Sequence, residues 1–188
     1  MVLSFLKIKV NYALTSIILF VTQILISFIS IKSFDYFNVI NYKQLLFSFA
    51  LGITTFILEY LLGSFFGKSK TNPTKKANAI FIFCILLLPI SEEIYFRVFM
   101  LEQIQTISIT NLNINVFFVL ISAVVLVINH IQALFDKAIL IQKFLIEGLL
   151  LSTVFVLQKN IWVTIIAHEV FNVINLVYYY KIGGIYNE

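Results

Sequence analysis

The chain has 188 residues, of which 61% are hydrophobic and 12% are charged, and its mean hydropathy is +1.00. Apolar runs of about 20 residues recur along its length, which is typical of a polytopic membrane protein and not of a soluble domain. The net charge of +4 does not indicate nucleic-acid binding, because the lysines lie in the short connections between apolar runs, where the positive-inside rule places them. The single cysteine, Cys84, excludes an intramolecular disulfide.

Six apolar segments are each long enough to cross the hydrocarbon core of a bilayer. In chain order they are residues 11–31, 44–66, 79–105, 115–134, 138–157 and 161–180. We therefore expect an all-α, polytopic transmembrane bundle with about six spanning helices. The first segment follows two lysines like a signal sequence, but it is long and no small-residue cleavage site follows it, so we interpret it as a retained span.

The distribution of lysines predicts the orientation of the bundle in the membrane. If the N-terminus is inside, nine lysines are cytoplasmic and three are outside. The nine are Lys7, Lys9, Lys68, Lys70, Lys75, Lys76, Lys137, Lys143 and Lys181, and the three are Lys32, Lys43 and Lys159. We therefore expect both termini to be cytoplasmic. The many Ile, Asn, Lys and Phe residues indicate an AT-rich genome, so we expect the membrane to be a bacterial plasma membrane.

The third segment carries two adjacent acids and an arginine in the sequence PISEEIYFR, residues 89–97. An ionised group near the bilayer centre costs roughly 2.5–3.5 kcal/mol on insertion scales, so such a group indicates a functional site. Glu93 and Arg97 stand at positions i and i+4 of a helix and can pair, whereas Glu92 points about 100° away and lacks that partner. A carboxylate in a low-dielectric environment binds a proton more readily, as a general base working near neutral pH must. Pro89 predicts a kink beside the acids.

The chain contains only two histidines, and both lie in apolar segments. His130 lies near the end of the fourth segment, and His168 shares a helix face with Asn172 and Asn175 in the sixth. We expect Glu92, His130, His168 and Asn172 to converge from three helices, although a count along straight spans places His168 at a different depth from His130. Such a group can hold and deprotonate a water molecule and polarise a peptide carbonyl.

Three motifs in this order resemble those of the CPBP family, the CAAX-protease and bacteriocin-processing intramembrane proteases, also called Abi. They are Glu-Glu-x-x-x-Arg at 92–97, an apolar helix ending in His130, and His-x-x-x-Asn at 168–172. The resemblance covers about residues 79–180. It implies that Glu92 activates the water, that Glu93 and Arg97 support it, and that His130, His168 and Asn172 complete the catalytic site. It also divides one integrated domain into N-terminal helices and a loop (1–78) and a catalytic core (79–188).

Two positions depart from the family pattern. Leu126 stands where the second motif usually has Phe, and Val98 stands where Gly usually follows the motif arginine. Neither change removes a polar group, so we expect altered packing and retained chemistry. A metal such as zinc, held by Glu92, His130, His168 and Asn172, stays open as an alternative, but amide oxygen is a poor ligand for zinc. His168-Glu169-x-x-Asn172 also lacks the second histidine of the His-Glu-x-x-His metalloproteases.

These observations predict an intramembrane endopeptidase acting on a hydrophobic or lipid-associated peptide, in peptide or bacteriocin maturation or in self-immunity. The alternatives are a structural charge network, a non-catalytic immunity or scaffold protein that binds a bacteriocin or sensor, and a proton-coupled transporter, against which the lack of a repeated half counts. Glu59 and Glu147 also lie in apolar segments. Glu147 has Lys143 one turn before it and is expected to form a structural pair. Glu59 has no role that the sequence indicates.

Overall fold

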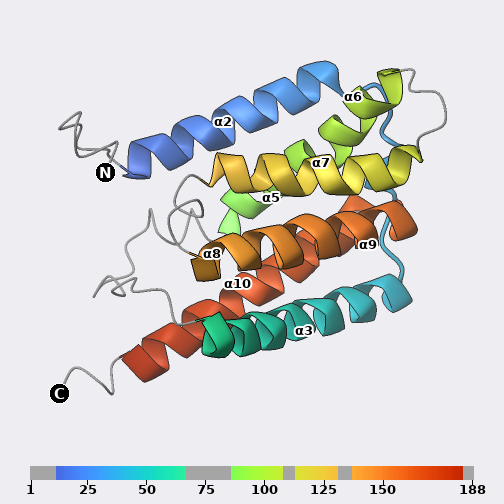
Figure 1. Cartoon of the computed structure of the whole chain (residues 1–188). Helices are drawn as coiled ribbons and strands as arrows, with labels where there is room; N and C mark the ends of the chain where they lie inside the picture. The colour runs from blue at the N-terminus through green and yellow to red at the C-terminus, as the bar shows by residue number, and fades with distance from the viewer. Residues whose placement is uncertain (1–11, 67–85, 108–112, 131–136, 184–188) are drawn as a thin grey trace.

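The computed structural model describes residues 12–66, 86–107, 113–130 and 137–183, and all regular structure in these ranges is helical (Figure 1). The elements are α2 (Tyr12–Ser30), the short η1 (Asp35–Phe37), α3 (Tyr42–Phe66), α5 (Leu88–Glu93), η2 (Ile94–Phe99), α6 (Met100–Thr106), α7 (Ile114–Asn129), α8 (Lys137–Ile141), η4 (Gln142–Leu150), α9 (Leu151–Gln158) and α10 (Ile161–Gly183). The predicted all-α bundle is confirmed.

Each of the six predicted segments corresponds to a helical stretch. Two of these stretches contain a π-helical segment, in which backbone N–H groups bond to carbonyls five residues earlier: α5, η2 and α6 form one stretch, and α8, η4 and α9 form the other. The fourth helix ends at Asn129, earlier than expected. The expected segments 79–85 and 131–134 and the loop 67–78 lie outside the described residues.

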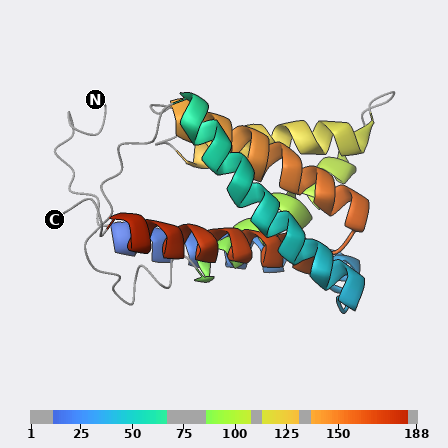
Figure 2. The ribbon, with the colours of Figure 1, turned by 90° about the horizontal axis from the view of Figure 1, so that it is seen from below.

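The stretch α5–η2–α6 lies at the centre of the bundle. It packs against α2, α7 and α10, and α3 packs along α10 and reaches α8 and η4. Seen from below, α2 and α10 lie on one side of it, α7 and α8–α9 lie on the other, and α3 crosses obliquely (Figure 2). The helix that carries the two acids is therefore surrounded by the elements that carry the histidines.

Two glycines allow helices to approach closely. A Cβ at Gly148 would lie 2.6 Å from the Cβ of Ala123 on α7, and a Cβ at Gly52 would lie 2.7 Å from the carbonyl oxygen of Ala167 on α10. Real Cβ atoms do not come this close to other heavy atoms, so a side chain at either site would force the helices apart. The close contact between η4 and α7 places the backbone of η4 next to the central helix.

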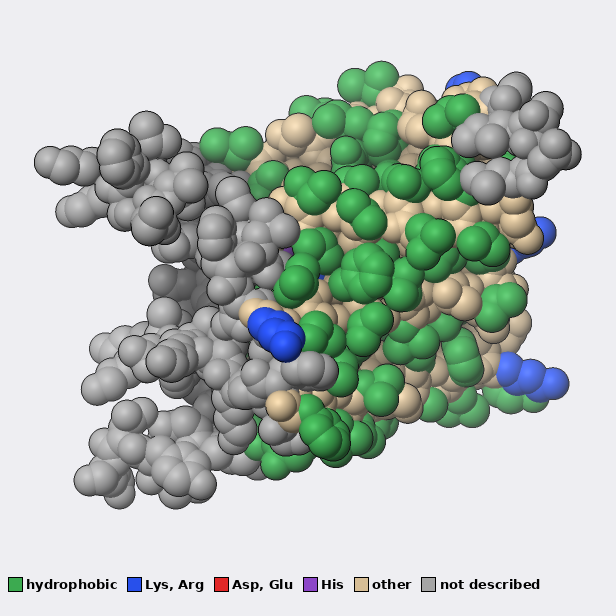
Figure 3. All heavy atoms as spheres, viewed as in Figure 1, with side chains coloured by type: hydrophobic (Ala, Val, Ile, Leu, Met, Phe, Trp, Pro, Cys, Tyr) green, Lys and Arg blue, Asp and Glu red, His purple; other side chains and the backbone are tan. Residues whose placement is uncertain are grey.

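The surface between the two ends of the bundle is apolar. Large side chains such as Ile18, Phe28 and Ile57 are exposed there, and hydrophobic side chains cover most of the face in Figure 3. Three stretches are long and apolar enough to cross a membrane, Tyr42–Leu62, Ile139–Gln158 and Ile161–Tyr178, while Ile17–Ser30 and Ile114–Asn129 are shorter. Among the described residues, three of the six expected spans thus meet the length and composition of a membrane-crossing helix, and the number of spans stays a prediction.

Candidate active site

The central helix begins at Leu88, with Pro89 in its first turn, and presents Glu92 and Glu93 just before the π-helical segment. Glu93 and Arg97 are fully buried, with 1% and 0% of their surfaces exposed. Their predicted ion pair is confirmed, since Glu93 Oε2 lies 3.2 Å from Arg97 Nε. Burying these charges is tolerable only because they are paired.

Helix α10 brings His168 to the same carboxylate. His168 Nδ1 lies 3.0 Å from Glu93 Oε1, and the ring is buried. Because a carboxylate accepts hydrogen bonds, this contact places a proton on Nδ1 and leaves Nε2 directed away from Glu93. Glu93 is therefore held between Arg97 and His168 and has little freedom to act as a base.

Glu92 faces a different histidine. Its Oε1 lies 3.6 Å from Nε2 of His130, the residue that caps the end of α7. The other ring nitrogen, Nδ1, lies 2.9 Å from the carbonyl oxygen of Leu126, so Nδ1 donates its proton there. Since a backbone carbonyl makes this contact, Leu126 in place of the family's phenylalanine leaves it intact.

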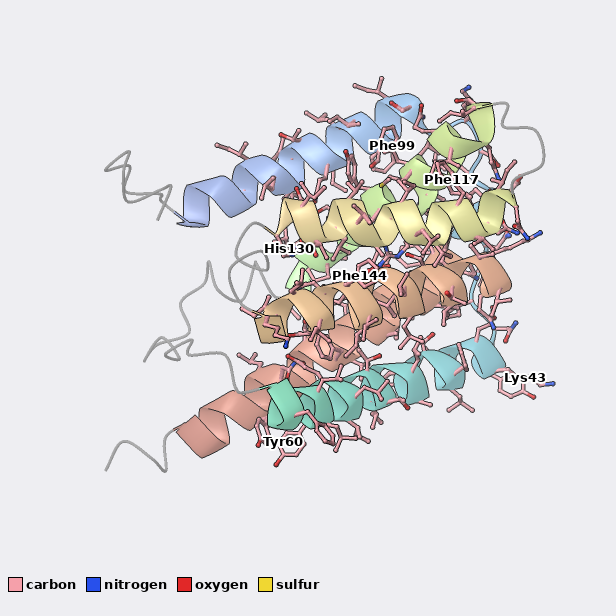
Figure 4. All side chains as sticks on the ribbon, viewed as in Figure 1. Lys43, Tyr60, Phe99, Phe117, His130 and Phe144 are labelled. Atoms are coloured by element: carbon pink, nitrogen blue, oxygen red, sulfur yellow. The ribbon has the colours of Figure 1, made fainter. Side chains whose placement is uncertain are left out.

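The two pairs differ in exposure. The His130 side chain is 24% exposed and that of Glu92 is 9% exposed, whereas the side chains of Glu93 and His168 are at most 3% exposed. Figure 4 shows His130 at the end of α7, close to the end of the bundle where α8 begins. Of the two pairs, Glu92 and His130 are therefore the more accessible.

Arg97 is held by two partners that the sequence analysis did not select. Its Nη1 donates to Ser122 Oγ of α7 at 2.9 Å, and its Nη2 donates to the carbonyl oxygen of Glu147 in η4 at 2.5 Å. Serines occur at many positions of apolar helices without a polar partner in the sequence pattern, so nothing distinguished Ser122 beforehand. Its complete burial, at 0% exposure, is visible only in the structure.

Glu147 and Glu59, two further acids in apolar segments, also have partners. Lys143 Nζ lies 2.6 Å from both carboxylate oxygens of Glu147, which confirms the predicted pair. Glu59, which the sequence left without a role, accepts a hydrogen bond from Asn175 Nδ2 of α10 at 2.7 Å.

The structure groups the predicted site residues in two pairs. Glu92 pairs with His130 and Glu93 pairs with His168, while Asn172 lies half-buried one turn after His168 on α10. Within the described ranges, no three His, Cys, Asp or Glu side chains are grouped as metal ligands would be. Protein zinc sites use at least three such ligands, so this arrangement does not fit zinc and we derive no step through a metal.

Comparison with known families gives a match. The family model described as type II CAAX prenyl endopeptidase Rce1-like matches residues 74–174, more than half of the chain. The match contains both pairs and Asn172. No curated protein and no solved structure matches the chain. The resemblance predicted from the three motifs is confirmed, and the chain belongs to the Rce1-like family of type II CAAX prenyl endopeptidases.

Proposed function

We propose that the protein is an intramembrane endopeptidase in which Glu92 activates a water molecule for attack on a peptide carbonyl. The observation that carries this proposal is the geometry between Glu92 and His130. With its proton on Nδ1, His130 directs the lone pair of Nε2 towards a carboxylate oxygen 3.6 Å away. Two acceptors that face each other need a shared donor, and a water molecule bound by the Glu92 carboxylate beside Nε2 supplies one.

The reaction follows from the roles of these groups. Glu92 takes a proton from the water as the oxygen attacks the carbonyl carbon, and it returns the proton to the leaving amine when the C–N bond breaks. His168, whose Nδ1 donates to Glu93, acts as an imidazolium that donates from Nε2–H to the carbonyl oxygen, and together with the Asn172 amide it stabilises the negative charge that develops there. Arg97 keeps Glu93 ionised and in position.

The substrate is a hydrophobic or lipid-associated peptide in the membrane, because only such a chain reaches residues buried among these helices. A membrane location agrees with the three apolar helices and with the family, whose description refers to prenylated substrates. We place the biological role in peptide or bacteriocin maturation or in self-immunity, in a bacterial plasma membrane.

The test is cleavage of membrane peptides by purified protein in liposomes, comparing the wild type with Glu92→Gln. Glutamine keeps the shape of the side chain and removes the base, so cleavage should fall by about 10²–10⁴-fold. Glu59→Gln is the matched control, because it removes another carboxylate from an apolar helix, away from the two histidine pairs, and should cleave like the wild type. Inhibition by a chelator would contradict the metal-free mechanism.

The binding-only alternative makes the opposite prediction. If wild-type protein cleaves no peptide and Glu92→Gln still protects cells against a bacteriocin, the chain acts as a non-catalytic immunity or scaffold protein.

A further inference from the structure

We propose that Ser122 is a positioning residue that, together with the two π-helical segments, sets the orientation of Arg97 and through it the Glu93–His168 pair. This inference rests on the proposed function, since it concerns the same site. It starts from a feature shared by η2 and η4: each leaves one backbone carbonyl available in the interior of the bundle.

In η2 this carbonyl belongs to Phe96. The N–H of Met100 bonds to the carbonyls of Tyr95 and Arg97 and bypasses that of Phe96, which it would use in an α-helix. The hydroxyl of Ser122, on the neighbouring α7, donates to the Phe96 carbonyl oxygen at 3.1 Å. The π-helical segment thus creates an acceptor for Ser122.

In η4 the bypassed carbonyl belongs to Glu147. The N–H of Leu151 bonds to the carbonyls of Ile146 and Gly148. The Glu147 carbonyl oxygen instead accepts from Arg97 Nη2 at 2.5 Å. The two bypassed carbonyls therefore accept hydrogen bonds from Ser122 and Arg97, which bond to each other, although the carbonyls lie about 50 residues apart in the chain.

The Ser122 hydroxyl has three buried partners. It donates to the Phe96 carbonyl oxygen at 3.1 Å, accepts from Arg97 Nη1 at 2.9 Å, and lies 2.9 Å from the Ser152 hydroxyl, a contact in which either oxygen can be the donor. Ser122, Ser152 and Arg97 are all 0% exposed, so water does not replace a lost partner. The guanidinium is consequently held by hydrogen bonds at Nη1 from α7 and at Nη2 from η4, and by its ion pair with Glu93.

Removal of the Ser122 hydroxyl leaves Nη1 of a buried cation without a partner. The guanidinium then shifts to recover one, and because Glu93 is bound to Arg97 on one side and to His168 on the other, the displacement reaches the imidazole. Ser122 touches neither histidine, so its effect on His168 passes through Arg97.

The first test is kinetic. Ser122→Ala should lower kcat about 10–100-fold, the range for partners that orient a catalytic group, with little change in KM. Ser48→Ala is the matched control, because this buried hydroxyl bonds to the Gln44 carbonyl of its own helix α3 and the variant should keep wild-type kcat. In an Arg97→Met background, Ser122→Ala should have no further effect on kcat, whereas a purely structural serine would give additive losses.

The second test does not depend on cleavage. The protein contains two histidines, so ¹⁵N-histidine NMR in detergent gives two imidazoles that a His130→Gln variant assigns. Ser122→Ala should move the titration midpoint of His168 by about half a pH unit or more, because the interaction between His168 and the displaced Glu93 carboxylate changes. The titration midpoint of His130 should stay unchanged. Ser48→Ala should move neither signal.

The outcomes separate the two proposals. If no peptide is cleaved by the wild type but His168 responds to Ser122→Ala, the peptidase function fails and the positioning role stands. If peptides are cleaved and Ser122→Ala matches Ser48→Ala in kcat and in the His168 titration, the positioning role is overturned. If Ser122→Ala does not fold, Ser152→Ala takes its place, because it removes only the Ser152 hydroxyl from Ser122. Ser152→Ala must then move the His168 titration midpoint in the same direction by a smaller amount. If that midpoint does not move, the proposal is overturned.

Discussion

Arg97 is the residue of the site whose partners are most closely fixed in kind and direction. It is fully buried, forms an ion pair with a carboxylate, and donates from Nη1 to a hydroxyl and from Nη2 to a backbone carbonyl. A planar guanidinium can serve these partners at once because its donors point in fixed, divergent directions. The residue that supports the proposed catalytic groups is thus specified by geometry as well as by charge.

Arg97→Lys should therefore not behave as a conservative change. Lysine keeps the positive charge for Glu93, but a single ammonium on a flexible chain cannot also reach Ser122 and the Glu147 carbonyl. At least one buried acceptor loses its partner, so we expect a loss of about 1–3 kcal/mol in the free energy of unfolding and a fall in cleavage. Thermal unfolding in detergent and the liposome cleavage assay measure the two effects.

Lys143→Arg serves as the control for this substitution. Lys143 is partly exposed and bonds to a single carboxylate, which arginine also binds, so stability and cleavage should stay near wild type. Equal behaviour of Arg97→Lys and Lys143→Arg would contradict the assigned role of Arg97.

The contacts within single helices could be predicted from the sequence, whereas among those between helices only the meeting of Glu92 with His130 could be. Glu93–Arg97 and Lys143–Glu147 follow from i, i+4 spacing, and both pairs form. The depth mismatch that straight spans predict does not separate the two histidines, because they meet adjacent glutamates that lie only about 1.5 Å apart along one helix. Adjacent glutamates point about 100° apart, so each faces a separate helix, and a count along straight spans does not contain this information.

At the scale of elements, the two π-helical segments distinguish this bundle from a set of regular helices. The sequence pattern does not reveal them, because apolar side chains fill a π-helical turn as readily as an α-helical one. Each lies where another helix supplies a polar side chain to a bypassed carbonyl, so tertiary contacts accompany the change in backbone bonding. Such segments are frequent at functional sites.

Gly148 permits the close contact between η4 and α7, which keeps the Glu147 carbonyl and the Ser122 hydroxyl beside Arg97. In Gly148→Ala the new Cβ would lie 2.6 Å from the Cβ and 2.7 Å from the Cα of Ala123, and backbone atoms do not move aside cheaply. We expect overpacking to cost about 1–3 kcal/mol of stability. Cleavage should fall as well, because separation of η4 from α7 pulls the Glu147 carbonyl and Ser122 apart around Arg97. Thermal unfolding and the cleavage assay are the measurements.

A compensating substitution makes this prediction specific. Ala123→Gly removes the methyl group that the new side chain meets, so the Gly148→Ala/Ala123→Gly double variant should recover part of the stability and the cleavage. If the double variant is no better than the sum of the single changes, the loss arises from something other than helix separation.

For the whole molecule, the arrangement of helix ends gives the site a direction across the membrane. The start of α2 and the end of α10 lie at the same end of the bundle, together with the end of α7 and the start of α8 (Figure 1). His130 and Lys137 belong to that end. Lys32, Lys43 and Lys159 adjoin the opposite ends of these helices. The lysine distribution therefore predicts that the Glu92–His130 pair lies towards the cytoplasmic face.

Cysteine labelling of intact cells tests this orientation. In a Cys84→Ser background, Val39→Cys, at a 93% exposed position between η1 and α3, should react with a membrane-impermeant maleimide. Lys137→Cys, at the exposed start of α8, should react only after the membrane is permeabilised. Both variants should be labelled in detergent, which controls for reactivity of the thiols. The expected labelling pattern requires that a peptide substrate reach the proposed catalytic water from the cytoplasmic side. The reverse pattern in intact cells would place His130 towards the outside, and the substrate would then have to enter from the outer leaflet.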